Sequence, residues 1–193
     1  MSAAAPARPS RDDLRVAVRR TAAGERAARS TADEAGNPGW RITPLRAADL
    51  DAVRALDALA FPGNPWQKGG YPAALARREA YVLRLADGSV AGVFAVREAD
   101  GAMTLEKMAV LPELRGRGLG RWFFRWALLY AREAGAARAV LQVREDNARA
   151  IDIYLAAGMR VTRRMENHYP TGCPTAMEME MVLGSPSAAP GAA

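Results

Sequence analysis

Apolar residues recur at the spacing of an amphipathic helix in two segments of the chain. Segment 119–134 carries the longer run, and Gly135 directly after it is a typical C-terminal stop. Segment 48–60 shows the same periodicity over a shorter length. We therefore predict two helices, whose apolar faces are formed by Phe123, Trp126, Ala127, Tyr130 and Ala134 in the first and by Leu50, Val53, Leu56 and Leu59 in the second.

Short apolar or alternating segments, separated by turn residues, predict strands. Asp87-Gly88 joins two of them and is a common hairpin turn. Segment 176–183 alternates Met and Glu, the period-two pattern of a strand with one polar face. Strands are expected at 40–44, 81–85, 90–97, 103–111, 139–143, 159–163 and 176–183, with short helices at 72–78 and 148–157. This order predicts an α/β sandwich, a mixed sheet with flanking helices.

The two ends of the chain differ in composition from the rest. Residues 1–38 are rich in Ala, Arg, Ser and Pro and poor in large apolar side chains, which predicts a disordered or weakly helical extension. Residues 184–193 are small, polar and interrupted by proline, so we expect a disordered tail. One folded domain is predicted over residues 39–183.

Composition narrows the functional classes. No segment approaches the roughly 18 consecutive apolar residues that a membrane span needs, and we expect a cytoplasmic protein with no membrane partner. The single cysteine, Cys173, excludes an internal disulfide and a multi-cysteine metal site, and we expect no metal. The net charge is +6, but no aromatic and basic patch accompanies it, so nucleic acid is not an expected partner. A basic surface also attracts anionic ligands.

A glycine-rich turn links the apolar strand at 103–111 to the helix at 119–134. Its glycines permit positive φ, and N–H groups at the start of a helix bind anions. Arg115, Arg117 and Arg121 add positive charge. The turn lacks the Gly-Lys-Ser/Thr of nucleoside-triphosphate loops and the dinucleotide fingerprint. An ordinary strand-to-helix connection explains the glycines equally well at this point.

The turn resembles the pyrophosphate loop of the GNAT acetyltransferases, Arg/Gln-x-x-Gly-x-Gly/Ala, through Arg115, Gly118 and Gly120. The resemblance implies acetyl-CoA as co-substrate and a GNAT fold, with a mostly antiparallel sheet and a splayed strand pair at the acetyl-CoA site. It also implies that the preceding strand pairs with the pantetheine arm. The implied binding residues are Met108, Ala109, Val110, Arg115, Gly116, Arg117, Gly118, Leu119, Gly120, Arg121, Asn147 and Tyr154.

Segment 141–158 is similar to a second GNAT motif, Asn-x-x-Ala-Ile-x-x-Tyr-x-x-x-Gly-Phe, with Met159 in place of the usual aromatic residue. On its own, Asn147 is explained as a helix N-cap and Tyr154 as a core aromatic. The resemblance implies that Asn147 contacts the cofactor and that the hydroxyl of Tyr154 protonates the leaving thiolate. A backbone N–H near the end of the strand at 103–111, expected at Val110, would polarise the thioester carbonyl.

Two further segments are similar to the substrate loops of the RimI-like N-terminal acetyltransferases. They are Phe61-Pro62 with Trp66, and Asn167-His168-Tyr169-Pro170. Generic proline turns with aromatic anchors are an alternative explanation for both. The resemblance covers residues 40–183, and it implies that Phe61, Pro62, Trp66, Gln142 and Tyr169 contact the acceptor.

The chain departs from this family at the general base. Gln142 stands at the position of a titratable base, twelve residues ahead of Tyr154, and an amide takes no proton at neutral pH. Glu106 and His168 are the substitute candidates. A solvent-facing carboxylate and an incidental loop histidine are equally simple explanations. A peptide α-amine has a pKa of about 8, so a dedicated base is dispensable for that acceptor.

Three functions are compatible with these patterns. The first is acetyl-CoA-dependent N-acetylation of the N-terminal α-amine of a protein or peptide, ribosomal proteins included, by direct attack of the amine. The second is acetylation of a small amine such as an aminoglycoside, a polyamine or an amino acid. The third is a non-catalytic acyl-CoA-binding regulatory module. The expected assembly is a monomer or a homodimer.

Overall fold

A computed structural model describes residues 40–62, 64–116, 118–170 and 172–184. The predicted extension over residues 1–38 and the tail beyond Gly184 lie outside this part of the chain. The described residues form seven strands: β1 (Arg41–Pro44), β2 (Ala80–Arg84), β3 (Val90–Ala99), β4 (Ala102–Val110), β5 (Arg138–Arg144), β6 (Arg160–Met165) and β7 (Ala176–Val182). The helices are α2 (Leu50–Ala60), α3 (Gly70–Ala76), α4 (Leu119–Glu133) and α5 (Ala148–Ala156), with 3-10 turns at Ala47–Asp49 and Pro112–Leu114.

The predicted elements are confirmed, with shifts at their ends. The prediction placed the start of the third helix at Pro72, whereas α3 begins at Gly70. Proline is tolerated in the first turn of a helix because its missing N–H has no intrahelical acceptor there. Strand β3 runs on to Ala99, and Asp100 and Gly101 both take positive φ at the turn into β4. None of the helices among the described residues is long and apolar enough to span a membrane.

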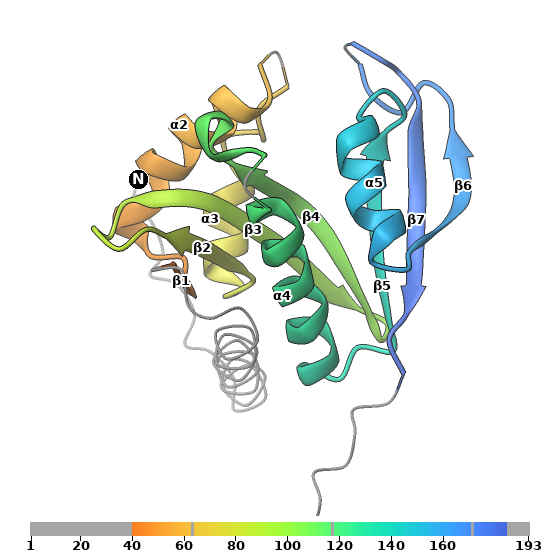
Figure 1. Cartoon of the computed structure of the whole chain (residues 1–193), viewed down its shortest axis with the longest axis horizontal. Coiled ribbons are helices and arrows are strands. Elements are labelled where there is room, and N and C mark those ends of the chain that lie inside the picture. Colours follow the sequence, from red (N-terminus) through yellow and green to blue (C-terminus); the bar gives the residue numbers. More distant parts are fainter. Residues whose placement is uncertain (1–39, 63, 117, 171, 185–193) are drawn as a thin grey trace, which may run out of the picture.

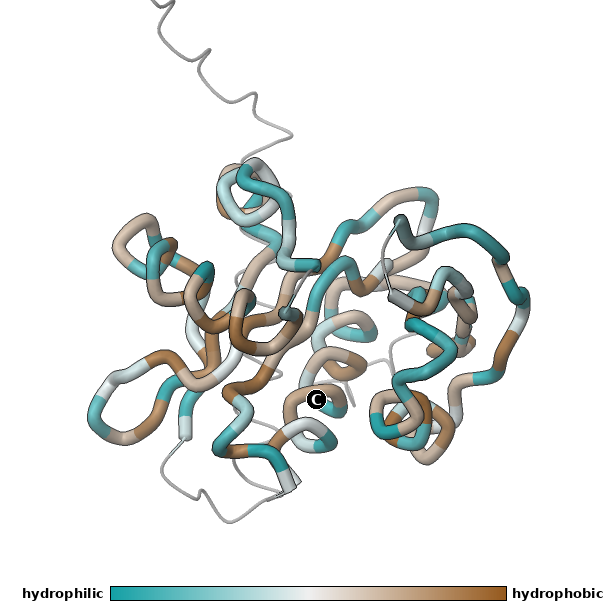
Figure 2. The backbone as a smooth tube through the Cα atoms, turned by 90° about the horizontal axis from the view of Figure 1, so that it is seen from above, coloured by the Kyte–Doolittle hydropathy of each residue, from teal (hydrophilic) through white to brown (hydrophobic). Residues whose placement is uncertain are grey.

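The strands form one sheet in the order β1-β2-β3-β4-β5-β7-β6. Every neighbouring pair is antiparallel except β4 and β5, which are parallel. The expected mixed, mostly antiparallel sheet is therefore confirmed. Figure 1 shows α4 in front of the sheet, with α5 lying over β5 and β7. Figure 2, turned by 90°, shows hydrophobic residues toward the inside and hydrophilic residues around the outer loops.

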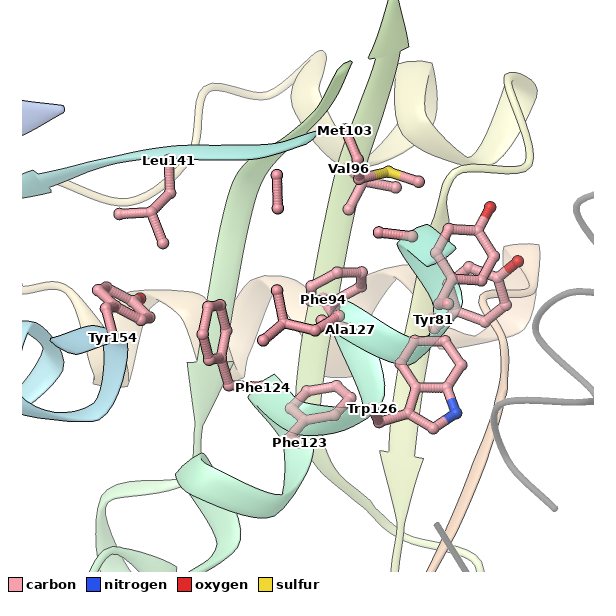
Figure 3. Close-up of a cluster of buried hydrophobic side chains, with 14 of the residues drawn as sticks. Tyr81, Phe94, Val96, Met103, Phe123, Phe124, Trp126, Ala127, Leu141 and Tyr154 are labelled. Carbon is pink, nitrogen blue, oxygen red and sulfur yellow. The ribbon is translucent and has the colours of Figure 1, made fainter. Parts of the chain in front are cut away.

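Each face of the sheet has its own core. Alternate residues of a strand point to opposite faces, and β3 divides accordingly. Phe94 and Val96 belong to the cluster that packs on α4, whereas Val93 and Ala95 belong to the cluster under α2 and α3. On α4 the predicted apolar face is confirmed for Phe123, Trp126 and Ala127 (Figure 3) and for Tyr130, all of which are buried, whereas Ala134 at the C-cap is half-buried. On α2 Val53 and Leu56 are buried and Leu50 is half-buried, but the prediction for Leu59 is wrong, because 61% of this residue is exposed. The helices therefore fix the sheet from both sides.

The pairing of β4 with β5 is short. It covers only Ala102–Leu105 opposite Arg138–Leu141, although β4 continues to Val110 and β5 to Arg144. On its other side, β4 has a bulge, because Ala95 pairs with Lys107 and Val96 with Leu105 while Glu106 lies between them. A bulge bends its strand and increases the local twist. Figure 1 shows the two strands diverging beyond this point, and we call this divergence the fork.

Candidate functional site

A cavity of about 1200 Å³ occupies the fork. Its walls are residues 105–110 of β4 and residues 141–144 of β5. The start of α4 and α5 contribute Arg115, Gly116, Gly118, Arg121, Asn147 and Arg149 to its lining. The α2–α3 connection and neighbouring segments contribute Phe61, Asn64, Trp66, Arg77, Arg97, Glu106 and Tyr169. These parts of the lining adjoin one another, because Arg115 donates to Ala60 O at the end of α2 at 3.4 Å.

The backbone of β4 offers free polar groups to this cavity. Hydrogen-bonded and non-hydrogen-bonded pairs alternate along antiparallel strands. The N–H of Leu111 donates to Ala91 O at 2.9 Å, so the pairs of Gly92 with Val110 and Phe94 with Met108 are non-hydrogen-bonded. Met108 and Val110 therefore direct their N–H and C=O groups away from β3, toward the fork. Ala109 directs its own toward β3.

The start of α4 is built to expose N–H groups. Gly116 and Gly118 have φ of +87° and +82°, a region that L side chains rarely adopt. The first intrahelical bond runs from the N–H of Trp122 to Gly118 O at 3.0 Å, so the N–H groups of the preceding helical residues have no acceptor within the helix. Arg115 and Arg121 line the cavity beside them. Arg117 lies outside the described residues. Such a helix start fits a phosphate group.

The remaining glycine of the turn has a packing role. A Cβ on Gly120 would lie 3.3 Å from Cδ1 of Ile153 in α5, tighter than most contacts of a real side chain. Gly120 therefore lets α4 and α5 approach each other. Leu119 is buried in the core and Gly120 lines the cavity.

Asn147 serves as the N-cap of α5 and also lines the cavity. Its Oδ1 accepts a hydrogen bond from the N–H of Ala150 at 3.3 Å. This is the simple explanation that the sequence offered. The cap uses only the oxygen of the amide, so the NH₂ group remains a donor for a ligand.

Tyr154 lies on α5 at the centre of the cavity wall. It is buried, its ring centroid is 4.7 Å from that of Phe124, and Figure 3 shows it beside Phe124 and near Leu141. Burial, reinforced by Tyr169, raises the pKa of the Tyr154 phenol above its ordinary value. The phenol therefore stays protonated at neutral pH, and the described residues give its hydroxyl no hydrogen-bond partner.

The two candidate bases differ in their placement, since Glu106 lines the cavity and His168 does not. The Oε2 of Glu106 accepts from Arg77 and its Oε1 accepts from Arg97, each at 2.8 Å. Two guanidinium groups therefore hold both oxygens of this carboxylate through charge-assisted hydrogen bonds. It is not the solvent-facing carboxylate of the simpler explanation, since only 19% of its side chain is exposed. His168 is exposed and does not line the cavity, which argues against a role in proton transfer.

The residues expected to contact the acceptor substrate lie in the cavity lining, with one exception. Phe61, Trp66, Gln142 and Tyr169 all line the cavity, whereas Pro62 is exposed and does not. Gln142 directly follows the last residue of β5 that pairs with β4. Its Nε2 donates to Oε2 of Glu178 on β7 at 3.3 Å. Sequence reasoning missed Glu178, although its place in the Met and Glu alternation was visible.

A buried ion pair holds the α2–α3 connection. The Nζ of Lys107 lies 3.1 Å from Oδ1 of Asp57, and Asp57 also accepts from the backbone N–H of Trp66. The same Nζ lies 3.7 Å from the centroid of the Phe61 ring. Burial lowers the pKa of Lys107, and Asp57 opposes this shift. The sequence contained one signal for this pair, two charged residues within otherwise apolar segments.

These features define a class of protein: an α/β protein whose sheet parts between two parallel strands to hold an extended, anionic ligand. Residues 50–159 match the model of the Acetyltransferase (GNAT) family. The chain therefore belongs to this family of acetyltransferases, and acetyl-CoA is its acetyl donor.

Individual relatives agree with this assignment. The [ribosomal protein bS18]-alanine N-acetyltransferase of Escherichia coli K12 is 27% identical over 130 residues, 67% of this chain and 87% of that protein. The streptothricin acetyltransferase of Streptomyces lavendulae is 41% identical over 75 residues, 38% of this chain and 40% of that protein. The crystal structure of the ribosomal-protein-S18-alanine N-acetyltransferase from Escherichia coli superposes with a TM-score of 0.69 at 26% identity, covering 75% and 94% of the two chains.

Replacing Lys107 by Met should destabilise the fold, because Asp57 is 2% exposed and loses its counter-charge. Breaking a buried ion pair typically costs about 3 kcal/mol. Urea unfolding measures the change, and Lys68→Met is the matched control because Lys68 is exposed. Equal stability of the two variants would contradict the role of the pair.

Proposed function

We propose that this acetyltransferase acts on the N-terminal α-amine of a protein or peptide. The observation that carries the proposal is the amide of Gln142 at the fork, beside Glu106, whose carboxylate two arginines hold. Without a base in the cavity, the acceptor amine must already be neutral when it binds. At pH 7.5 about 30% of an α-amine is neutral, against about 0.1% of a lysine-like amine, from pKa values of about 7.9 and 10.4. The difference is a factor of about 200.

The charge of the cavity supports the same conclusion. Of the described residues that line it, seven are basic and two, Glu106 and Asp152, are acidic. A polyamine or an aminoglycoside carries several positive charges and needs carboxylates to bind it, so these acceptors fit poorly. An anionic donor such as acetyl-CoA fits well. The resemblance to bS18-alanine N-acetyltransferases makes ribosomal protein N-termini the first candidates.

The residues that line the cavity have separate proposed roles in the reaction. The N–H groups at the start of α4, with Arg115 and Arg121, bind the pyrophosphate, and Asn147 donates to the pantetheine arm. The N–H of Val110 polarises the thioester carbonyl, and Tyr154 gives its proton to the leaving thiolate. Phe61, Trp66 and Tyr169 enclose the acceptor. Acetyl-CoA supplies the activated acetyl group.

A panel of amines tests the acceptor. Peptides with a free N-terminus and an internal lysine, the same peptides with a blocked N-terminus, spermidine and an aminoglycoside are incubated with the full chain and acetyl-CoA at pH 7.5. We expect acetyl on the α-nitrogen, on the order of 100-fold faster than on lysine. Mass spectrometry of fragments locates the group. Faster turnover of spermidine or the aminoglycoside would refute the proposal.

Replacing Gly118 by Val should weaken the binding of acetyl-CoA, because φ is +82° there and a side chain strains the turn that exposes the N–H groups. Gly101→Val is the matched control. Gly101 has φ of +69° in the β3–β4 turn, away from the cavity, and a Cβ added at either glycine would meet no neighbouring atom within 4 Å. Isothermal titration should show at least a tenfold higher Kd for the first variant alone; equal affinities would contradict this role of the turn.

Replacing Tyr154 by Phe should lower kcat by on the order of 100-fold if the phenol is the general acid. The pKa of Tyr154 is raised, so the phenol stays protonated as the pH rises and kcat should show no decline up to pH 9.5. Steady-state rates from pH 6 to 9.5 measure both effects. A decline centred below pH 10 that the Phe variant lacks would show instead that this phenol loses its proton early.

A further inference from the structure

Gln142 is held by a residue from the neighbouring strand. Gln142 and Glu178 are direct cross-strand partners on β5 and β7. The Nε2 of Gln142 donates to Oε2 of Glu178 at 3.3 Å, and Arg163 of β6 donates to the same oxygen at 3.0 Å. Arg163 thus offsets the charge of Glu178 and holds its carboxylate from the side opposite Gln142.

This contact determines which end of the amide faces the acceptor. A carboxylate only accepts hydrogen bonds, and a glutamine amide donates only through its nitrogen. The nitrogen of Gln142 therefore faces Glu178 through one of its two N–H groups, which turns Oε1, the only acceptor of the amide, away from Glu178. Gln142 lines the cavity, so this oxygen is its group that can accept a hydrogen bond there.

We propose that Glu178 is a positioning residue that locks the amide of Gln142, so that Oε1 accepts a hydrogen bond from the acceptor amine. The inference rests on the proposed function, because it concerns the same amine. It explains how a chain with an amide at the base position still aligns its acceptor. With one N–H held by Oε1, the nitrogen lone pair is directed at the thioester carbonyl.

The proton balance follows from this arrangement. The neutral amine forms the new C–N bond as the C–S bond breaks, and the thiolate receives the proton of Tyr154. The nitrogen then carries one proton too many, which leaves to water, and the Tyr154 phenolate regains a proton from solvent. Gln142 and Glu178 exchange no proton at any stage.

Glu178→Met removes the acceptor that orients the amide and keeps the length of the side chain. We expect kcat/KM for the amine to fall about fivefold, the usual cost of one positioning hydrogen bond. The affinity for acetyl-CoA and the pH dependence should stay unchanged. Glu180→Met is the matched control, because Glu180 lies on the same strand and face and also pairs with an arginine, Arg138 at 3.6 Å, but its partner on β5 is Val140 and not Gln142.

An exchange of the two side chains provides a second test, which distinguishes a positioning role of Glu178 from a purely structural one. In the double variant Gln142→Glu/Glu178→Gln the hydrogen bond is kept, but the cavity now contains a carboxylate able to take the proton. We expect kcat/KM to return toward wild type, and the ratio of the rates at pH 6.5 and pH 8.5 to rise at least threefold. This measurement remains informative if Glu178→Met folds poorly.

Three results would overturn the inference. They are an unchanged kcat/KM in Glu178→Met, a loss equal to that of Glu180→Met, and an altered pH dependence in Glu178→Met, which would make Glu178 itself the base. The assay uses whichever amine of the panel wild type acetylates fastest. A wrong acceptor class therefore changes the substrate of the assay and refutes the proposed function, while the comparison of variants still decides the role of Glu178.

Discussion

Strand β4 pairs with β5 only as far as Leu105. Beyond that residue, the N–H and C=O groups on this side of β4 need other hydrogen-bond partners. Buried N–H and C=O groups are costly when unpaired. Strand β3 satisfies half of them, but the alternation of the antiparallel pairing leaves those of Met108 and Val110 directed into the fork. An extended ligand that carries amides, such as the pantetheine arm of acetyl-CoA, can complete such an edge as an added strand does. We therefore propose that the unpaired edge of β4 determines where the donor binds.

The rest of the structure keeps this edge open and orients what enters it. The bulge at Glu106 turns β4 away from β5, and α4 packs its aromatic face on β2 and β3 so that its N-terminus lies beside the fork. On the other face, the pair of Lys107 with Asp57 holds the connection that bears Phe61 and Trp66. The residues proposed to bind the donor and those proposed to bind the acceptor thus line one cavity.

Much of the fold and of the donor site was predictable from local sequence patterns. Periodicity gave the helices and strands, and the glycine turn with Asn147 and Tyr154 indicated the donor. The pairing of charged side chains was not predictable, because it joins residues distant in sequence. Arg77 reaches Glu106 only because α3 ends over the bulge of β4, and Gln142 meets Glu178 only through the register of β5 with β7. Periodicity reports which face a residue occupies, whereas a partner on that face depends on the complete topology.

A crystal structure of the full chain with acetyl-CoA tests the central claim most directly. The pantetheine arm should lie between β4 and β5, with hydrogen bonds to the backbone of Met108 and Val110. The pyrophosphate should lie at Gly116–Gly120, and the sulfur should lie beside the hydroxyl of Tyr154. A pantetheine arm bound elsewhere, or strands β4 and β5 paired along their full length in the complex, would contradict the account.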